Sequence, residues 1–209
     1  MPLTTLKSRR SLLIGQAGFS LVELIVAGTL MVGMLLAGGV FMYSGDNSKA
    51  GNLLAITTEL GNAAARYNAD TGLHPKYPSA LFVKGYNTST YTMEAQNATD
   101  AWRGPYISGL SSSSSATGDY PLTNHVSGAT ATFQTRTTDL PSGAVEGHKV
   151  RVGPLPQRVF LALLNACNGT SITSYSSAPT NHANGQKCIN QSYATATNTG
   201  YVEYLYQVY

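Results

Sequence analysis

The stretch GQAGFSLVELIV, residues 15–26, decides the fold that we expect for this chain. It opens a long apolar segment, yet it places a carboxylate, Glu23, five residues after Gly18. An acidic side chain near the centre of a membrane-spanning helix costs about 2.5 kcal/mol or more, so it is rare there without a partner. The position of Glu23 therefore needs an explanation.

The apolar segment is long enough to cross a membrane. No charged residue occurs from Leu24 to Gly45. As a helix this segment would be about 33 Å long, which covers the hydrocarbon core of a bilayer. Lys7, Arg9 and Arg10 precede it, and the positive-inside rule places such residues in the cytoplasm. We therefore expect a single membrane pass, with the rest of the chain exported.

The composition limits the possible partners. Of 209 residues only 11% are charged, against roughly 25% in average soluble proteins. The formal net charge is +3, and without the three basic residues before residue 11 the numbers of basic and acidic residues are equal. A neutral body gives no general electrostatic reason to bind nucleic acid.

Two cleavage routes are consistent with the N-terminal sequence. A signal peptidase could cut after the apolar segment, where Ala37-Gly38-Gly39 supplies small residues, and Glu23 would then have no role. Cleavage after Gly18 would instead keep the apolar segment in the mature chain. Glu23 would then be the fifth residue, one helical turn from a new α-amino group.

The second route leads to a family resemblance. Basic residues, then Gly18 followed by F-S-L-V-E-L-I-V, resemble the processing and methylation motif of type IV pilins and of the related pseudopilins of type II secretion. The resemblance implies cleavage after Gly18 by a prepilin peptidase, N-methylation of Phe19, and pairing of Glu23 with the Phe19 amine of a neighbouring subunit. An amine and a carboxylate offset each other's desolvation in lipid. The length of the leader is typical of type IVb pilins, whereas Phe19 is typical of type IVa.

Beyond the apolar segment the pattern becomes amphipathic. Apolar residues recur at steps of three and four, at Leu53, Ile56, Leu60, Ala63, Ala64 and Tyr67. Thr71-Gly72, followed by Pro75, predicts the end of the helix. We therefore predict one helix over residues 19–70, apolar all round in its first half and with one apolar face in its second.

The remaining sequence predicts a sheet and a short helix. Residues 129–137, 148–152 and 201–209 have strand patterns, and residues 154–169 contain a helix in which Val159, Leu163 and Ala166 share a face and Gly169 caps the end. The segment DAWRGPYIS, residues 100–108, resembles one found in pseudopilins and several pilins, and we expect Trp102 to be structural. The run Ser111 to Ser115 predicts a solvated loop.

These elements together predict an α+β protein with the pilin fold, in which a long N-terminal helix packs through its amphipathic half on a C-terminal antiparallel β-sheet. The expected divisions are a leader at 1–18, a hydrophobic membrane and assembly segment at 19–45, an amphipathic helical half at 46–72, and a globular region at 73–209. The globular region includes a C-terminal disulfide region.

The two cysteines, Cys167 and Cys188, predict a disulfide. In an exported protein an even pair favours a bond over two free thiols. The segment between them, residues 168–187, is rich in Ser, Thr, Asn and Gly, and it has almost no apolar residues whose burial could offset its ordering entropy. A cross-link would fix this segment as a surface feature.

Catalytic motifs are absent from the sequence. His74, His125, His148 and His182 stand alone, with no H-E-x-x-H, C-x-x-C or G-x-S-x-G motif and no phosphate-binding glycine loop. We therefore expect no enzyme activity, cofactor or metal, and we expect the histidines to be scattered over the surface.

The resemblance implies a function. It predicts a structural subunit of a type IV pilus that inserts in the bacterial inner membrane with its N-terminus in the cytoplasm, and then forms an extracellular homopolymer. Prepilin peptidase and the pilus assembly machinery would be its partners, and adhesion, motility or DNA uptake its uses. The alternatives are a minor pilin or a type II secretion pseudopilin and, from another class, a membrane-anchored enzyme, which would leave Glu23 unexplained.

Overall fold

The computed structural model describes residues 21–108, 118–182 and 185–209, with side chains from residue 45 onward. Helix α1, Leu21–Thr71, is the first described element. The chain divides into two units, Met1–Met42 and Tyr43–Tyr209, and the boundary lies within α1. Among the residues with described side chains, no helix combines the length and the apolar character that a membrane crossing requires.

The predicted fold class needs a correction. The pilin fold expected from the sequence treats the long N-terminal helix and the sheet as parts of one fold, and this is wrong. The unit that contains the sheet starts at Tyr43, and its described α-helices are residues 43–71 of α1 and the shorter helix α2. The long N-terminal helix is not an element of this mixed helix and sheet unit. A segment that is apolar all round has no single face that favours a sheet, whereas an amphipathic segment has one.

The amphipathic part of α1 packs through the face that the sequence predicts. Its buried apolar residues are Ala50, Leu53, Leu60, Ala63, Ala64 and Tyr67. The helix ends at Thr71, where the Thr71 hydroxyl donates to the Tyr67 carbonyl over 2.8 Å. Gly72 follows with φ +72°, a left-handed conformation that glycine adopts without steric cost. The predicted end of the helix is therefore confirmed.

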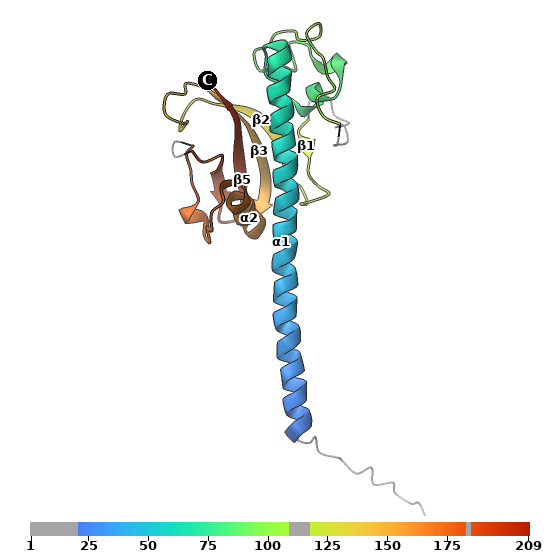
Figure 1. Ribbon diagram of the computed structural model, residues 1–209, viewed down its shortest axis with the longest axis vertical. Coiled ribbons are helices and arrows are strands. Elements are labelled where there is room, and N and C mark those ends of the chain that lie inside the picture. Colours follow the sequence, from blue (N-terminus) through green and yellow to red (C-terminus); the bar gives the residue numbers. More distant parts are fainter. Residues whose placement is uncertain (1–20, 109–117, 183–184) are drawn as a thin grey trace, which may run out of the picture. The chain divides into compact units, whose positions relative to one another are not determined.

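Five antiparallel strands form one sheet in the order β1-β2-β3-β5-β4 (Figure 1). The strands are β1 Tyr120–Pro121, β2 Thr130–Arg136, β3 Gly147–Pro156, β4 Cys188–Ala194 and β5 Thr199–Val208. The predicted strands correspond to β2, β3 and β5. Strands β1 and β4 were not predicted.

Helix α1 approaches the sheet closely at Gly61. A Cβ atom at this position would lie 2.9 Å from side-chain atoms of Tyr204 and of Tyr206, both on β5. Residue 61 must therefore be glycine, or the tyrosines must move. This contact fixes the amphipathic part of α1 against strand β5.

Strand β3 is covered on both of its faces. Residues from Gly147 to Val150 are all buried, although successive side chains of a strand point to opposite sides. On one face Val150 and Val152 belong to the main hydrophobic core together with Leu60 of α1. The opposite face must have a second cover, which the polar contacts described below identify.

Helix α2, Gln157–Asn168, follows β3 directly. It buries Val159, Phe160, Leu163 and Leu164 and ends at Gly169, whose φ of 65° is left-handed and whose N–H donates to the Asn165 carbonyl. The helix and its glycine cap are as predicted. Ala166, expected on the buried face, is exposed.

Between α1 and β1 the chain forms short 3-10 turns. These are η1, Pro78–Leu81, and η2, Lys84–Tyr86, and an isolated bridge joins Pro75 to Thr92. A third turn, η3, Tyr175–Ser177, follows α2. The indole N–H of Trp102 donates to the Ala80 carbonyl over 3.0 Å, and the ring packs against the core. Trp102 therefore has the structural role that its sequence context predicts.

Candidate functional site

The predicted processing site lies outside the described residues. Gly18 and Phe19 precede the first described position, Leu21. Glu23 belongs to helix α1, but its side chain is not among those described. Cleavage after Gly18, methylation of Phe19 and pairing through Glu23 therefore stay predictions.

The predicted disulfide is confirmed. Cys167 in α2 and Cys188 at the start of β4 are bonded, with their Cα atoms 6.0 Å apart. The side chain of Asn168 reinforces the link, because its amide donates to the Cys188 carbonyl over 2.6 Å and its oxygen accepts the Cys188 N–H over 3.0 Å. The bond therefore ties the end of α2 to the edge strand and closes residues 168–187 into a loop, which we call the disulfide loop.

A buried ionic cluster lies on the sheet face opposite α1. Glu203 of β5 is fully buried and contacts two cations. Lys149 of β3 donates to one of its carboxylate oxygens, and Arg136 of β2 donates to the other over 2.6 Å. Arg136 also binds Asp139 over 2.7 Å. We call Arg136, Lys149 and Glu203 the ionic triad.

The disulfide loop contacts this triad and covers it. The Arg136 guanidinium reaches the Thr180 carbonyl at 3.5 Å, and the backbone N–H of His182 donates to the Asp139 carbonyl over 2.8 Å. Burial lowers the pKa of the Lys149 ammonium, and its hydrogen bond to Glu203 opposes that change. The triad thus adds polar contacts to a loop whose Ile172, Tyr175 and Ala178 also pack against the core.

His182 is a buried residue of the disulfide loop. It is fully buried, and its Nδ1 lies 2.7 Å from the Gln186 carbonyl, while its Nε2 has no hydrogen-bond partner among the described residues. Burial is the largest cause that lowers its pKa, and the cations Arg136 and Lys149 lower it further, while the bond to the Gln186 carbonyl and the charge of Glu203 partly oppose the change. A neutral imidazole is therefore the form that suits this position.

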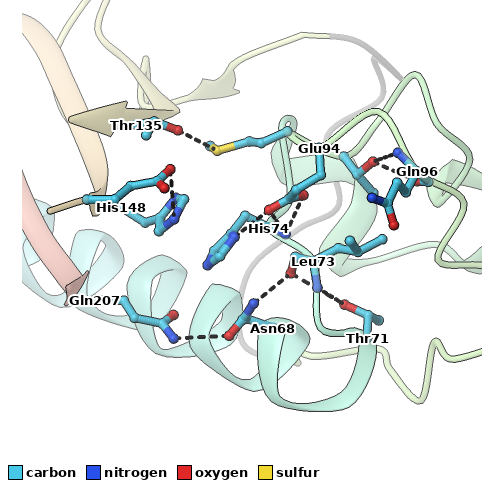
Figure 2. Close-up of polar contacts among 12 residues, drawn as sticks. Asn68, Thr71, Leu73, His74, Glu94, Gln96, Thr135, His148 and Gln207 are labelled. Carbon is cyan, nitrogen blue, oxygen red and sulfur yellow. Dashed lines mark hydrogen bonds and ion pairs between the residues drawn. The ribbon is translucent and has the colours of Figure 1, made fainter. Parts of the chain in front are cut away.

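A second polar cluster joins the loop after α1 to the other face of the sheet (Figure 2). His74 and His148 stack with their ring centroids 3.4 Å apart and their planes at 8°. Both are buried, with exposed fractions of 6% and 2%. Glu94 binds His74 through its carboxylate, 2.6 Å from Nδ1 and within 3.0 Å of the backbone N–H. We call these two rings the histidine pair.

The last residue of the chain belongs to the same cluster. The Tyr209 hydroxyl lies 3.2 Å from Nε2 of His74 and donates to the Asn68 side chain over 2.8 Å. Gln207 of β5 donates to the same Asn68 oxygen over 3.0 Å. The end of α1, the following loop and the C-terminus are therefore joined through one polar network.

The expectation that the histidines are scattered over the surface is wrong. His74, His148 and His182 are buried, and His125 is half-buried. They are separated in sequence but not in space, because strand pairing and loop packing bring them to other polar groups. One signal was present: His148 shares the strand period of Val150 and Val152, which predicts an inward side chain.

Comparisons with known proteins do not assign the chain to a family. Neither the protein-family models, nor the curated protein sequences, nor the solved structures gave a match. Among the residues that the structure describes, no group of three or more His, Cys, Asp or Glu side chains is placed to hold a metal ion.

Proposed function

We propose that this chain is the structural subunit of a type IV pilus filament. The observation that carries the proposal is the sequence around Gly18, where cleavage would place Glu23 at the fifth position of an apolar helix. The proposal accounts for a carboxylate in a segment that otherwise avoids charge. It concerns assembly and does not depend on the corrected fold class.

Assembly would proceed through the N-terminal segment. Before assembly the subunit is inserted in the bacterial inner membrane with its basic N-terminus in the cytoplasm, and prepilin peptidase removes residues 1–18. Each Glu23 then pairs with the Phe19 amine of a neighbouring copy, because two charges that are costly alone in lipid offset each other across the contact. The assembly machinery adds subunits to a homopolymer that extends outside the cell.

The helical conformation at position 23 supports this mechanism. The helix runs from Leu21 to Thr71 and includes position 23. A helix fixes the axial position of each side chain at about 1.5 Å per residue. A carboxylate so close to the new N-terminus is therefore well placed to set the register between neighbouring copies.

N-terminal sequencing and mass spectrometry of the protein from sheared fibres test the processing step. We expect a mature chain that begins at N-methylated Phe19, and we expect residues bulkier than alanine at Gly18 to block cleavage. A chain that begins near Val40 would show that a signal peptidase acts instead. An intact leader in assembled fibres would contradict the proposal.

Replacement of Glu23 by alanine tests the assembly step. The variant should insert in the membrane at least as well as the unchanged chain, since a charge is removed, but it should make few fibres. The unpaired Phe19 amine would cost about 3 to 5 kcal/mol at each contact. Asp100→Ala, which removes an exposed carboxylate, is the matched control. Normal fibre numbers from inserted Glu23→Ala subunits would exclude the pairing.

A minor pilin or a type II secretion pseudopilin is the second candidate. The segment DAWRGPYIS, residues 100–108, favours it, because this segment resembles one of pseudopilins. Both candidates share the N-terminal processing. The abundance of the chain in purified fibres separates them, since a major subunit forms most of the fibre mass and a minor one a small fraction.

A further inference from the structure

The histidine pair joins three segments that are far apart in sequence. His74 comes from the loop after α1 and His148 comes from β3 (Figure 2). Tyr209 follows β5 and contacts both rings. The two imidazole rings are in direct contact over their faces. The contact between this loop and the sheet therefore runs through two imidazole rings.

His74 has a place for a second proton. Its Nδ1 faces the Glu94 carboxylate at 2.6 Å, and its Nε2 faces the Tyr209 hydroxyl at 3.2 Å. Both neighbours can accept a hydrogen bond from a ring N–H. A positive charge on His74 would be compensated by the adjacent carboxylate.

Compensation is weaker at His148, where the neighbouring Glu146 carboxylate is exposed to solvent. The Nδ1 of His148 is buried without a hydrogen-bond partner among the described residues. Its Nε2 lies 3.6 Å from an oxygen of Glu146, which is too long for a hydrogen bond. A proton added to His148 would place a charge against the face of His74, in a site that is shielded from water.

We propose that the histidine pair is an acid-operated latch: protonation of His148 releases the loop of residues 73–96 and the C-terminal Tyr209 from the sheet, while the rest of the unit stays folded. The latch is a property of the folded unit and does not rest on the proposed filament function.

The groups around His148 give the direction of the response. Burial, and to a smaller extent the neighbouring His74, lower the pKa of His148 to about 4, and Glu94 opposes the change. An opened latch would expose the ring, which would then titrate near its ordinary value of about 6.5. The open form therefore binds protons more readily than the closed form, and acid favours opening.

The side chains that face the histidine pair come from the loop after α1 and from α1, β2, β3 and β5. The loop after α1 supplies His74 and Glu94, and the start of β3 is preceded by Glu146. From α1 comes the uncharged Asn68, and β2 places the uncharged Thr135 opposite His148. Strand β5 and the residue after it supply Tyr206 and Tyr209, and α1 supplies Tyr67; burial raises the pKa of all three, so they are uncharged in acid.

Residues 73–96 also bury Ala80 and Leu81 in the main core, so opening exposes these two residues, but the contacts of the opposite sheet face do not involve the pair. The ionic triad holds the opposite face of the sheet, and the disulfide joins α2 to β4 away from the pair. The amphipathic part of α1 keeps its own buried residues. Local opening of one segment at a lower free energy than global unfolding is common in proteins.

The experiment uses the purified full chain in detergent between pH 7.5 and 3.5. Trp102 is the single tryptophan of the chain. Its indole N–H donates to the Ala80 carbonyl, so its fluorescence reports on the loop of residues 73–96. Hydrogen exchange, corrected for the intrinsic pH dependence, compares residues 73–96 with the strands. We expect the loop to lose protection at a midpoint between pH 4 and 6.5, while β3, β4 and β5 keep theirs.

Two variants should move the midpoint in opposite directions. His148→Phe keeps an aromatic face that cannot be charged, so the loop should stay protected to the acid limit. Glu94→Gln removes the charge that favours protonated rings in the closed form and weakens the bonds to His74, so its loop should open at a higher pH. His125→Gln, which changes a half-buried histidine outside the pair, should leave the midpoint unchanged.

Three results would overturn the latch. One is loss of protection in the loop and the strands together, and another is a loop midpoint unaffected by His148→Phe. The third concerns Glu94→Gln, which changes a partly exposed side chain and should fold even if His148→Phe does not. A Glu94→Gln midpoint at or below that of the unchanged chain would refute the electrostatic reasoning by itself.

Discussion

Replacement of Glu203 by alanine would leave two cations without the carboxylate that they share. Glu203 is fully buried and Lys149 is 5% exposed, so water cannot replace the lost partner. Removing one member of a buried ion pair costs about 3 to 5 kcal/mol. We expect a loss near the upper end, because Lys149 has no other ion-pair partner among the described residues, whereas Arg136 retains Asp139. Such a loss would be a large part of the about 5 to 15 kcal/mol that stabilises a typical domain.

Urea unfolding of the full chain in detergent, with the disulfide intact, measures this loss. At a slope of about 2 kcal/mol per molar urea, the midpoint should fall by about 2 M. Lys149→Met combined with Glu203→Leu should recover most of the loss, since apolar residues of similar volume often replace a buried pair without cost. Glu59→Ala breaks an exposed pair with Arg66 and should cost less than about 1 kcal/mol.

The outcome that would refute this reasoning is equally specific. If Glu203→Ala costs no more than Glu59→Ala, then the buried cations of the triad do not depend on Glu203. If the double replacement is no more stable than Glu203→Ala, then the cost does not come from stranded charge.

Two further predictions concern the disulfide and the pH dependence. Replacing Cys167 and Cys188 by serine should lower the free energy of unfolding by about 3 kcal/mol, by the loop-closure entropy for a sequence separation of 21, and denaturant titration of the variant checks this. The pKa of His148 is about 4 in the folded form and about 6.5 in the unfolded form, so the folded form binds fewer protons between these two pH values. The free energy of unfolding should therefore decrease as the pH is lowered from about 6.5 to about 4, by up to about 3 kcal/mol. The slope of stability against pH should be smaller in His148→Phe, and an equal slope would count against the assignment.

The strands predicted correctly are those whose pattern alternates in the sequence. Strands β2, β3 and β5 carry apolar or aromatic residues at every second position, and the sheet buries them. Strand β4 has the sequence CINQSYA, in which Asn190, Gln191 and Ser192 hide the period. Strand β4 is an edge strand that is held by its pairing with β5 and by the disulfide at Cys188. A local sequence pattern does not contain these contacts.

The fold class was wrong for a related reason. The sequence pattern of α1 predicts one helix, but the packing of its residues decides which part of that helix belongs to the unit that contains the sheet. The amphipathic residues after Tyr43 have an apolar face that the sheet can bury. The apolar residues before this point contribute to a different unit.

Among the site residues, only the disulfide could be predicted. Two cysteines leave one possible pair, whereas the ionic triad requires knowledge of the strand register. Lys149 is opposite Leu205, two positions from Glu203, so the contact runs diagonally across β3 and β5. In the sequence each charged residue of the triad is typical of a solvated surface position.

The low charge content of the chain gives this triad its importance. Glu203 is the only acidic residue after Glu146. In the structure the same scarcity means that no other carboxylate from the last 60 or so residues can replace Glu203 beside the two cations. A charged residue in such a chain is therefore more informative than one in an average soluble protein. Glu94 is likewise an informative charged residue, because its carboxylate lies within hydrogen-bond distance of the histidine pair.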